Sequence, residues 1–117
     1  MVTHETLLPS QIVTQPEHNL IALEGEIDLH ESPTVREALR GLIEKKLPHV
    51  FVDMAAVTYI DSSGLAVLIE AMQKVHGYGG RLALCGIRDN VRTVFELARL
   101  DQVFKIFPDV KSAMGGL

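Results

Sequence analysis

The sequence predicts an α/β fold, with a mainly parallel sheet of about five strands, an antiparallel hairpin at one edge and about four flanking helices. Short apolar runs alternate along the chain with amphipathic segments of helical period, which is typical of strand–helix–strand crossover units. The first two apolar runs are separated by a few turn-forming residues, which favours a hairpin. The chain has 117 residues, which is the size of one domain, so we expect a single domain spanning residues 1–117.

The hairpin is predicted from the first 23 residues. Residues 7–14 are interrupted by Pro9, and a proline in a strand favours the edge of a sheet. Residues 15–19 (QPEHN) are turn-forming, and the apolar residues 20–23 then predict a more buried strand. A connection this short predicts that the two strands are antiparallel.

The next two elements are predicted to be a helix and a central strand. Ser32 followed by Pro33 is typical of an N-cap and a first helical position. The helix should end near residues 46–48, because the residue before Pro48 resists the helical conformation. The apolar run at residues 50–52 has no polar alternation, which indicates a strand covered on both faces.

The rest of the chain continues this alternation, in which strands follow helices. Apolar residues at helical spacing from Leu65 to Val75 predict an amphipathic helix that ends at the glycine-rich turn 77–80. The further expected elements are a strand at 81–86, a helix capped by Asp89, a strand at 103–107, a short helix at 109–114 and a frayed end at 114–117.

Composition excludes several classes of function. The net charge is −4, with 11 basic against 15 acidic residues, so the basic surface of a nucleic-acid-binding protein is missing. The first residues do not form a signal peptide, and no apolar run approaches the length of a membrane span. Cys85 is the sole cysteine and cannot form an intramolecular disulfide, which favours a reducing compartment. We therefore expect a cytoplasmic protein without membrane insertion.

The segment Asp61-Ser62-Ser63-Gly64 is the most informative in the chain. It lies between an apolar run and the amphipathic helix, so its hydroxyl groups should stand near the helix N-terminus. One interpretation is that Ser62 or Ser63 is simply an N-cap. The other is that a serine here accepts a phosphate, which would bring negative charge to a helix end that tolerates anions. The local sequence alone does not decide between these two interpretations.

No active site or metal site is predicted. The nucleophile-elbow motif is absent around Ser62 and Ser63, and the loop 77–81 precedes a strand, unlike phosphate-binding loops. The five histidines, His4, His18, His30, His49 and His76, lack metal-ligand spacing. We therefore expect no catalytic residue, no metal and no cofactor, and Asp53 and Glu70 are not expected to form a carboxylate pair.

The chain resembles the STAS domain family, and specifically the stand-alone anti-sigma factor antagonists. The resemblance is carried by residues 23–28 (LEGEID) and 57–65 (VTYIDSSGL), and it continues through 79–82 (GGRL) and 91–107. It covers about residues 6–115, and the predicted order of elements matches that of the family. The D-S-[ST]-G step is quite specific in this context.

The resemblance implies a partner-switching mechanism. The family's phosphorylated serine corresponds to Ser62, and the phosphosite loop includes Asp61, Ser63 and Gly64. The unphosphorylated antagonist binds an anti-sigma factor that is also a serine kinase, and this binding frees the sigma factor. Phosphorylation breaks the complex and a serine phosphatase restores it. Within this loop, we interpret Ser63 as a helix cap or loop hydrogen-bonding group, and Gly64 as permitting close approach by the kinase.

The resemblance also suggests which residues contact the partner. The family's contact surface lies around the hairpin, the loop before the first helix and the phosphosite helix. This surface suggests Asp28, His30, Glu31 and Leu65. An alternative is that the protein is a stand-alone STAS adaptor subunit of a membrane transport assembly, a function that requires no phosphorylation.

Overall fold

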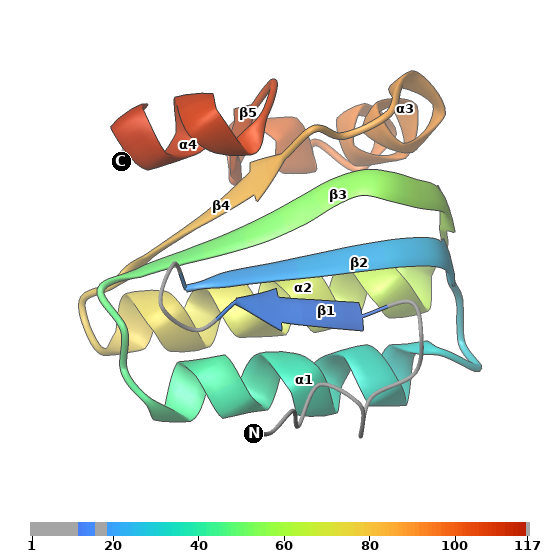
Figure 1. Cartoon of the computed structure of the whole chain (residues 1–117). Helices are drawn as coiled ribbons and strands as arrows, with labels where there is room; N and C mark the ends of the chain where they lie inside the picture. Colours follow the sequence, from blue (N-terminus) through green and yellow to red (C-terminus); the bar gives the residue numbers. More distant parts are fainter. Residues whose placement is uncertain (1–11, 16–18, 117) are drawn as a thin grey trace.

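The computed structural model describes residues 12–15 and 19–116, and it confirms an α/β fold with four helices and four parallel strands in this part of the chain (Figure 1). The elements are β1 (Ile12–Gln15), β2 (Leu20–Ile27), α1 (Ser32–Glu44), β3 (His49–Ile60), α2 (Ser62–Gly77), β4 (Arg81–Cys85), α3 (Asp89–Leu97), the 3-10 helix η3 (Leu100–Gln102), β5 (Lys105–Phe107) and α4 (Val110–Gly116).

The sheet has the strand order β1-β2-β3-β4-β5. Strands β2 to β5 are parallel to their neighbours, and β1 pairs with β2 in the antiparallel direction. Residues 7–11 of the expected first strand, which include Pro9, lie outside the described residues, as do residues 16–18 of the expected turn. His4 and His18 also lie outside them.

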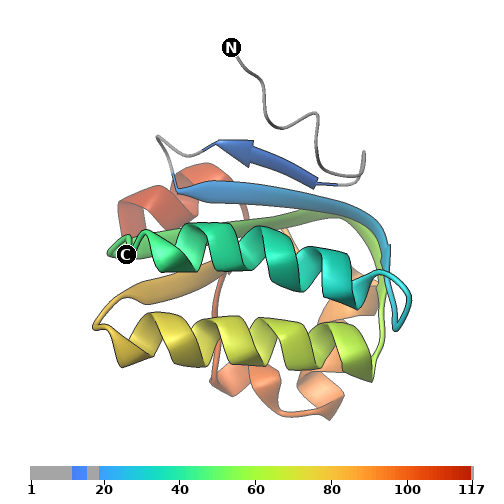
Figure 2. The same cartoon turned by 90° about the horizontal axis from the view of Figure 1, so that it is seen from below.

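Helices cover both faces of the sheet. Figure 2 shows α1 and α2 side by side across one face, and α4 packs on the other side against β3, β4 and β5. Along each strand the side chains alternate between these two faces, because successive side chains in a strand point in opposite directions. Helix α1 connects the parallel strands β2 and β3, and α2 connects β3 and β4. Both connections cross the same face, so α1 and α2 lie in one layer.

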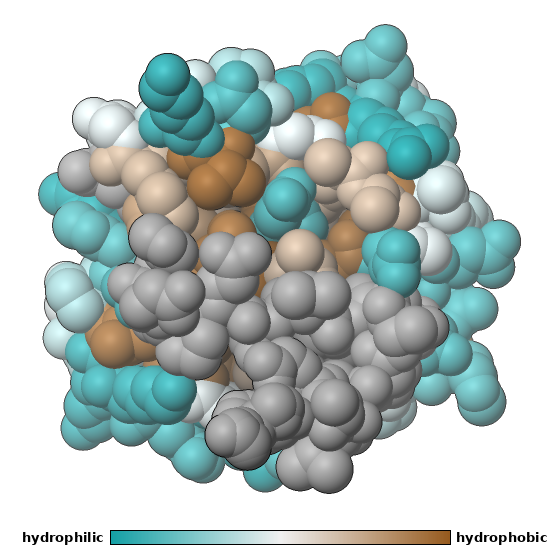
Figure 3. Space-filling model, viewed as in Figure 1, coloured by the Kyte–Doolittle hydropathy of each residue, from teal (hydrophilic) through white to brown (hydrophobic). Residues whose placement is uncertain are grey.

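Two apolar clusters fill the space between the layers. The larger one lies between the sheet and α1, α2 and α3, and it contains Ile21, Leu39, Val52, Leu68 and Phe95 among its buried members. The smaller one lies on the opposite face and consists of Leu20, Phe51, Ala83, Cys85 and Ala113. In the view of Figure 3, apolar residues gather above the grey atoms, and hydrophilic residues lie among them and along the top and sides of the molecule.

Strands β2 and β3 are longer than the apolar runs that predicted them. The expected strands ended at Leu23 and Val52, whereas the observed ones continue to Ile27 and Ile60, which pair with each other. Among the added residues, buried positions are separated by two or three exposed or half-buried ones, so the continuous apolar signal ends while the pairing continues. Gly25 has a φ of 80° at a register shift between the two strands, and glycine adopts this conformation without steric cost.

The start of α1 differs from the prediction. Ser32 is not the N-cap: it is the first helical residue, it is buried, and its hydroxyl donates to the carbonyl oxygen of Leu29 at 3.3 Å. Glu31 is the N-cap residue, and its backbone N–H donates to the Asp28 carboxylate at 3.0 Å. Pro33 is therefore the second residue of the helix, one position later in the helix than predicted.

The bounds of the C-terminal elements differ from the predicted ones. Asp89 is the first residue of α3 and not its cap. The last strand begins at Lys105 rather than Val103, because η3 and Phe104, which packs into the larger cluster, occupy the preceding positions. The final helix continues to Gly116, through most of the segment predicted to fray.

Cys85 behaves as a small apolar residue. It is completely buried in β4. Burial, together with the charges of Asp53 and Asp109, raises the pKa of its thiol to about 12. A thiol in the unfolded chain has a pKa of about 8.5.

This difference predicts a pH dependence of stability. Above the pKa of the unfolded thiol, the unfolded chain loses a proton that the folded protein retains, so the free energy of unfolding decreases as the pH rises. Between about pH 8 and about pH 10 the wild type should lose about 2 kcal/mol relative to Cys85→Ala. Urea denaturation of both proteins at the two pH values measures this difference. Equal losses in the two proteins would show that Cys85 ionises normally in the folded state.

Candidate functional site

The candidate site lies at the C-terminal ends of β2 and β3, which end side by side. We call this end of the sheet the candidate-site edge. The backbone N–H of Asp61 donates to the carbonyl oxygen of Ile27 at 3.3 Å. The loop that follows β2, residues 28–31, is thereby held beside the start of α2. Two segments more than 30 residues apart in sequence form one surface.

Asp61 caps helix α2. Its backbone is extended, with φ −114° and ψ −172°, and its carboxylate accepts hydrogen bonds from the N–H groups of Ser63 at 2.9 Å and Gly64 at 3.2 Å. The N–H of Leu65 donates to the Asp61 carbonyl oxygen at 3.0 Å. The interpretation of Ser62 or Ser63 as the N-cap was therefore wrong. A carboxylate at this position also suits the positive end of the helix dipole.

Ser62 is the first residue of α2, and it is exposed. Because Asp61 performs the capping, the fold does not require the Ser62 hydroxyl to cap the helix. An exposed hydroxyl on a rigid helix terminus is accessible to another protein. These properties make it the strongest candidate for modification in the segment.

Gly64 is buried, which assigns it a packing role. A Cβ atom at this position would lie 2.7 Å from the carbonyl oxygen of Ile27 and 2.7 Å from the Cγ1 atom of Ile60. The absence of a side chain lets α2 begin directly against the ends of β2 and β3. An added methyl group in such a contact costs about 2 kcal/mol. The expectation that Gly64 allows close approach by a kinase is thus replaced by close approach of the protein's own strands.

The structure brings three of the four expected contact residues to this surface. Asp28 and Glu31 are half-buried in the loop, and the Nε2 atom of His30 lies 3.8 Å from the Glu31 carboxylate. The side chain of His30 is 88% exposed. Leu65 differs, because it is only 8% exposed and belongs to the larger apolar cluster. It supports the helix from inside and offers little surface to a partner.

Two exposed apolar side chains at this edge were not predicted. Leu29 is 74% exposed and Tyr59 is 48% exposed. Leu29 falls outside the periodic segments and Tyr59 lies at the end of an apolar run, so neither stands out in sequence. The neighbouring helix α3 is tied to the same edge, because the Asn90 side-chain amide donates to the carbonyl oxygen of Thr58 at 2.8 Å.

Among residues 12–15 and 19–116, no three His, Cys, Asp or Glu side chains are grouped so that they could hold a metal ion. In the same part of the chain, no helix has the length and apolar character needed to cross a membrane.

Comparison with known proteins identifies the family to which the chain belongs. The family model described as the STAS domain matches residues 10–113. The chain belongs to the STAS domain family.

Several proteins that resemble this chain are named anti-sigma factor antagonists. An anti-sigma-B factor antagonist of Listeria monocytogenes is 32% identical over 100 residues, which cover 86% of this chain and 87% of that protein. The crystal structure of an anti-sigma factor antagonist from Mycobacterium paratuberculosis has a TM-score of 0.75 at 25% identity, covering 82% of this chain and 81% of the other. The Bacillus cell fate determinant SpoIIAA in its phosphorylated form has a TM-score of 0.64 at 22% identity, covering 82% of this chain and 86% of the other.

The role of Asp61 as a cap predicts the effect of its removal. Asp61→Ala leaves the N–H groups of Ser63 and Gly64 without their acceptor, and the loss of such a cap costs about 1 kcal/mol. Asp61→Ser is the matched control, because serine also caps helices well and should preserve most of the stability. Thermal and urea unfolding of the two variants measure the difference. Equal stability of Asp61→Ala and wild type would contradict the capping role.

Proposed function

We propose that this protein is an anti-sigma factor antagonist that is switched off by phosphorylation at Ser62. Unphosphorylated, it binds an anti-sigma factor with serine kinase activity and so releases a sigma factor. A serine phosphatase restores the active form. The protein itself catalyses no reaction and acts in the cytoplasm as a single STAS domain comprising residues 1–117. The observation that carries this proposal is the exposed Ser62 directly after the capping residue Asp61, in a STAS domain.

The geometry at α2 explains how a phosphate on Ser62 would act. The N–H groups of Ser63, Gly64 and Leu65 are already bonded to Asp61. A phosphate would find these donors occupied, so it would remain on the surface beside the Asp61 carboxylate. It brings about −1.5 to −2 charges at neutral pH. The phosphate would therefore change the charge of the contact surface and leave the fold as it is.

The acidic surroundings would increase this effect. Asp28 and Glu31 lie in the adjoining loop, and the whole chain carries a net charge of −4. Burying a phosphate dianion in an interface costs a few kcal/mol in desolvation and repulsion. Since about 1.4 kcal/mol corresponds to a tenfold change in affinity, one phosphate could weaken binding by about two orders of magnitude.

The contact surface that we propose combines this site with the loop after β2. Asp28, His30 and Glu31 supply polar and charged contacts, and the exposed side chain of Leu29 supplies an apolar anchor beside them. A small apolar centre with a charged rim is typical of protein interfaces. Leu65 is left out of this surface because it is buried.

Charge variants test the switch directly. Ser62→Asp should lose the captured kinase partner, because it places a carboxylate where the phosphate would stand. Gln73→Glu is the matched control, since it adds one negative charge at an exposed position of the same helix, about 16 Å from Ser62 along the helix axis. Affinity capture from the host lysate, with identification of partners by mass spectrometry, compares both with wild type. Ser62→Ala should still bind the kinase partner. When ATP is added, the kinase should not phosphorylate this variant.

Three outcomes would contradict the proposal. The first is phosphate appearing at full stoichiometry at another residue. The second is an unfolded circular-dichroism spectrum for Ser62→Asp, which would mean that Ser62 is needed for the fold. The third is capture of the same transport subunit by wild type and Ser62→Asp, which would identify the protein as an adaptor.

A further inference from the structure

A hollow lies at the end of the sheet opposite the candidate-site edge. The parallel strands β4 and β5 begin there, at Arg81 and Lys105. The hollow has a volume of about 320 Å³. The residues that line it are His76 near the C-terminal end of α2, Gly80, Arg81, Leu82, Val103 and Lys105.

The lining of this hollow contains three basic side chains and no carboxylate. Arg81, Lys105 and His76 are all exposed. Within residues 12–15 and 19–116, none of the three lies within ion-pair distance of a carboxylate. The chain as a whole has a net charge of −4. The hollow is therefore a local concentration of unneutralised positive charge on an acidic protein.

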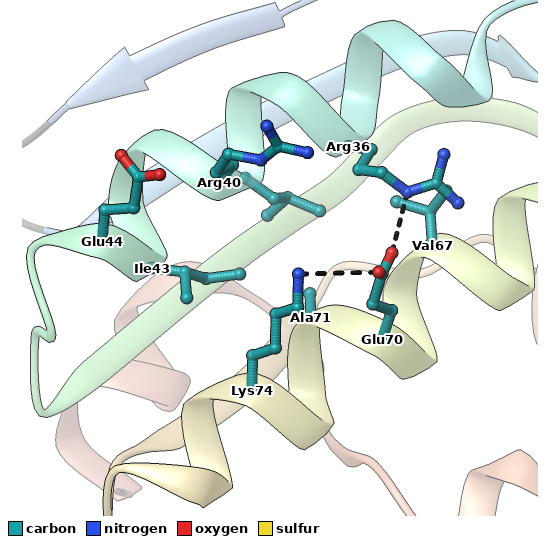
Figure 4. Close-up of a pocket in the computed structure, with 9 residues that line it drawn as sticks. Arg36, Arg40, Ile43, Glu44, Val67, Glu70, Ala71 and Lys74 are labelled. Carbon is teal, nitrogen blue, oxygen red and sulfur yellow. Dashed lines mark hydrogen bonds and ion pairs between the residues drawn. The ribbon is translucent and has the colours of Figure 1, made fainter.

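The basic side chains between α1 and α2 differ in this respect, because a carboxylate neutralises them. The Nε atom of Arg36 lies 2.8 Å from Oε1 of Glu70, and the Nζ atom of Lys74 lies 3.5 Å from the other carboxylate oxygen (Figure 4). The hydrogen bond from Arg36 is the main cause that lowers the pKa of Glu70. An anion between these helices would compete with Glu70, whereas an anion in the hollow beside Arg81 would meet no carboxylate among the lining residues.

The strand register sets the spacing of the two permanent cations. Lys105 pairs with Ala83, two residues after Arg81. Neighbouring strands lie about 4.8 Å apart and rise about 3.3 Å per residue, so the Cα atoms of Arg81 and Lys105 are about 8 Å apart. Both side chains are long enough to contact one anion from this distance. A guanidinium group binds two phosphate oxygens at once, and a lysine adds a compact positive charge.

The C-terminal end of α2 borders the hollow, and its last carbonyl groups are occupied. The carbonyl oxygen of Val75 accepts from the N–H of Gly80 at 2.9 Å, and that of His76 accepts from the N–H of Gly79 at 3.0 Å. These hydrogen bonds satisfy the negative end of the helix within the chain itself. The helix end therefore opposes an anion less than unpaired carbonyl groups would.

The lining also limits the size and polarity of a ligand. Leu82 is only 2% exposed and Gly80 is buried, whereas Val103 is 50% exposed. Among the lining residues, Val103 is thus the one apolar side chain that a ligand can touch. The volume is at the lower limit of ligand pockets. A compact and highly charged ligand fits these properties better than one with a large ring or a long aliphatic chain.

We propose that this hollow binds a compact ligand that carries a phosphate group. Arg81 and Lys105 hold the phosphate, and His76 supplies a further hydrogen-bond donor. The site differs from a glycine-rich phosphate-binding loop, because its donors are side chains. It lies at the opposite end of the sheet from Ser62, so its test does not depend on phosphorylation or on a protein partner.

An NMR titration of the full chain with inorganic pyrophosphate, at constant ionic strength, tests the proposal. Saturable shifts should appear at the amide signals of Gly80, Arg81, Val103 and Lys105, and acetate, which has a single charge, should bind much more weakly. Lys105→Gln should weaken pyrophosphate binding about fivefold. Lys111→Gln is the matched control, because it removes the same charge at an exposed position of α4 outside the hollow. It should leave binding unchanged.

A second pair of variants adds charge instead of removing it. Val103→Glu places a carboxylate inside the hollow, so it should abolish pyrophosphate binding. Val103 is half-exposed, and the circular-dichroism spectrum of this variant should remain that of a folded protein. Leu97→Glu adds the same charge at a position that is 82% exposed and outside the hollow, and it should still bind pyrophosphate.

Several results would overturn the proposal. They are the absence of saturable shifts at millimolar pyrophosphate, shifts at the N-terminus of α2 in place of the hollow, equal weakening by Lys105→Gln and Lys111→Gln, and equal loss of binding in Val103→Glu and Leu97→Glu. Binding to vesicles that contain phosphatidic acid, without any response to free pyrophosphate, would also overturn it, because the phosphate would then belong to a lipid surface.

Discussion

Asp61 makes hydrogen bonds in two directions at the point where the sheet meets helix α2. Its carboxylate accepts from the N–H groups of Ser63 and Gly64, and its own N–H donates to Ile27 at the end of β2. The first contacts orient α2, and the second joins the ends of two strands. Gly64 then allows the helix to lie against Ile27 and Ile60 without an intervening side chain. The position of Ser62 on the surface follows from these contacts.

The same arrangement connects the fold to the proposed switch. Parallel strands end at the same edge of a sheet, so the loop after β2 and the start of α2 become neighbours although they are far apart in sequence. Asp61 occupies the donors that would otherwise bind a phosphate on Ser62. The modification would then act through the charge of this surface.

Much of the fold could be predicted from sequence, because apolar periodicity reports which residues are buried. The order of elements and the extent of α2 follow from it. The helix caps were harder to predict: Ser32 and Asp89 both suit a cap by residue type, but the observed caps depend on where the chain leaves each strand. Leu65 was predicted as a contact residue from its place beside the phosphosite, yet the helix turns it into the core. The Arg36–Glu70 pair joins residues 34 positions apart, a separation at which no local pattern signals contact.

The central claim is that a phosphate on Ser62 changes the surface and leaves the fold unchanged. The most direct test is a comparison of amide NMR spectra of the unphosphorylated protein and the protein with phosphoserine genetically encoded at position 62. We predict shifts confined to residues 28–31 and 59–65, with the amide signals of the buried strand residues and of the C-terminal half of α2 unchanged. Shifts that extend along α2 and through β2 and β3 would contradict the claim, because they would mean that the phosphate displaces Asp61 and rearranges the helix.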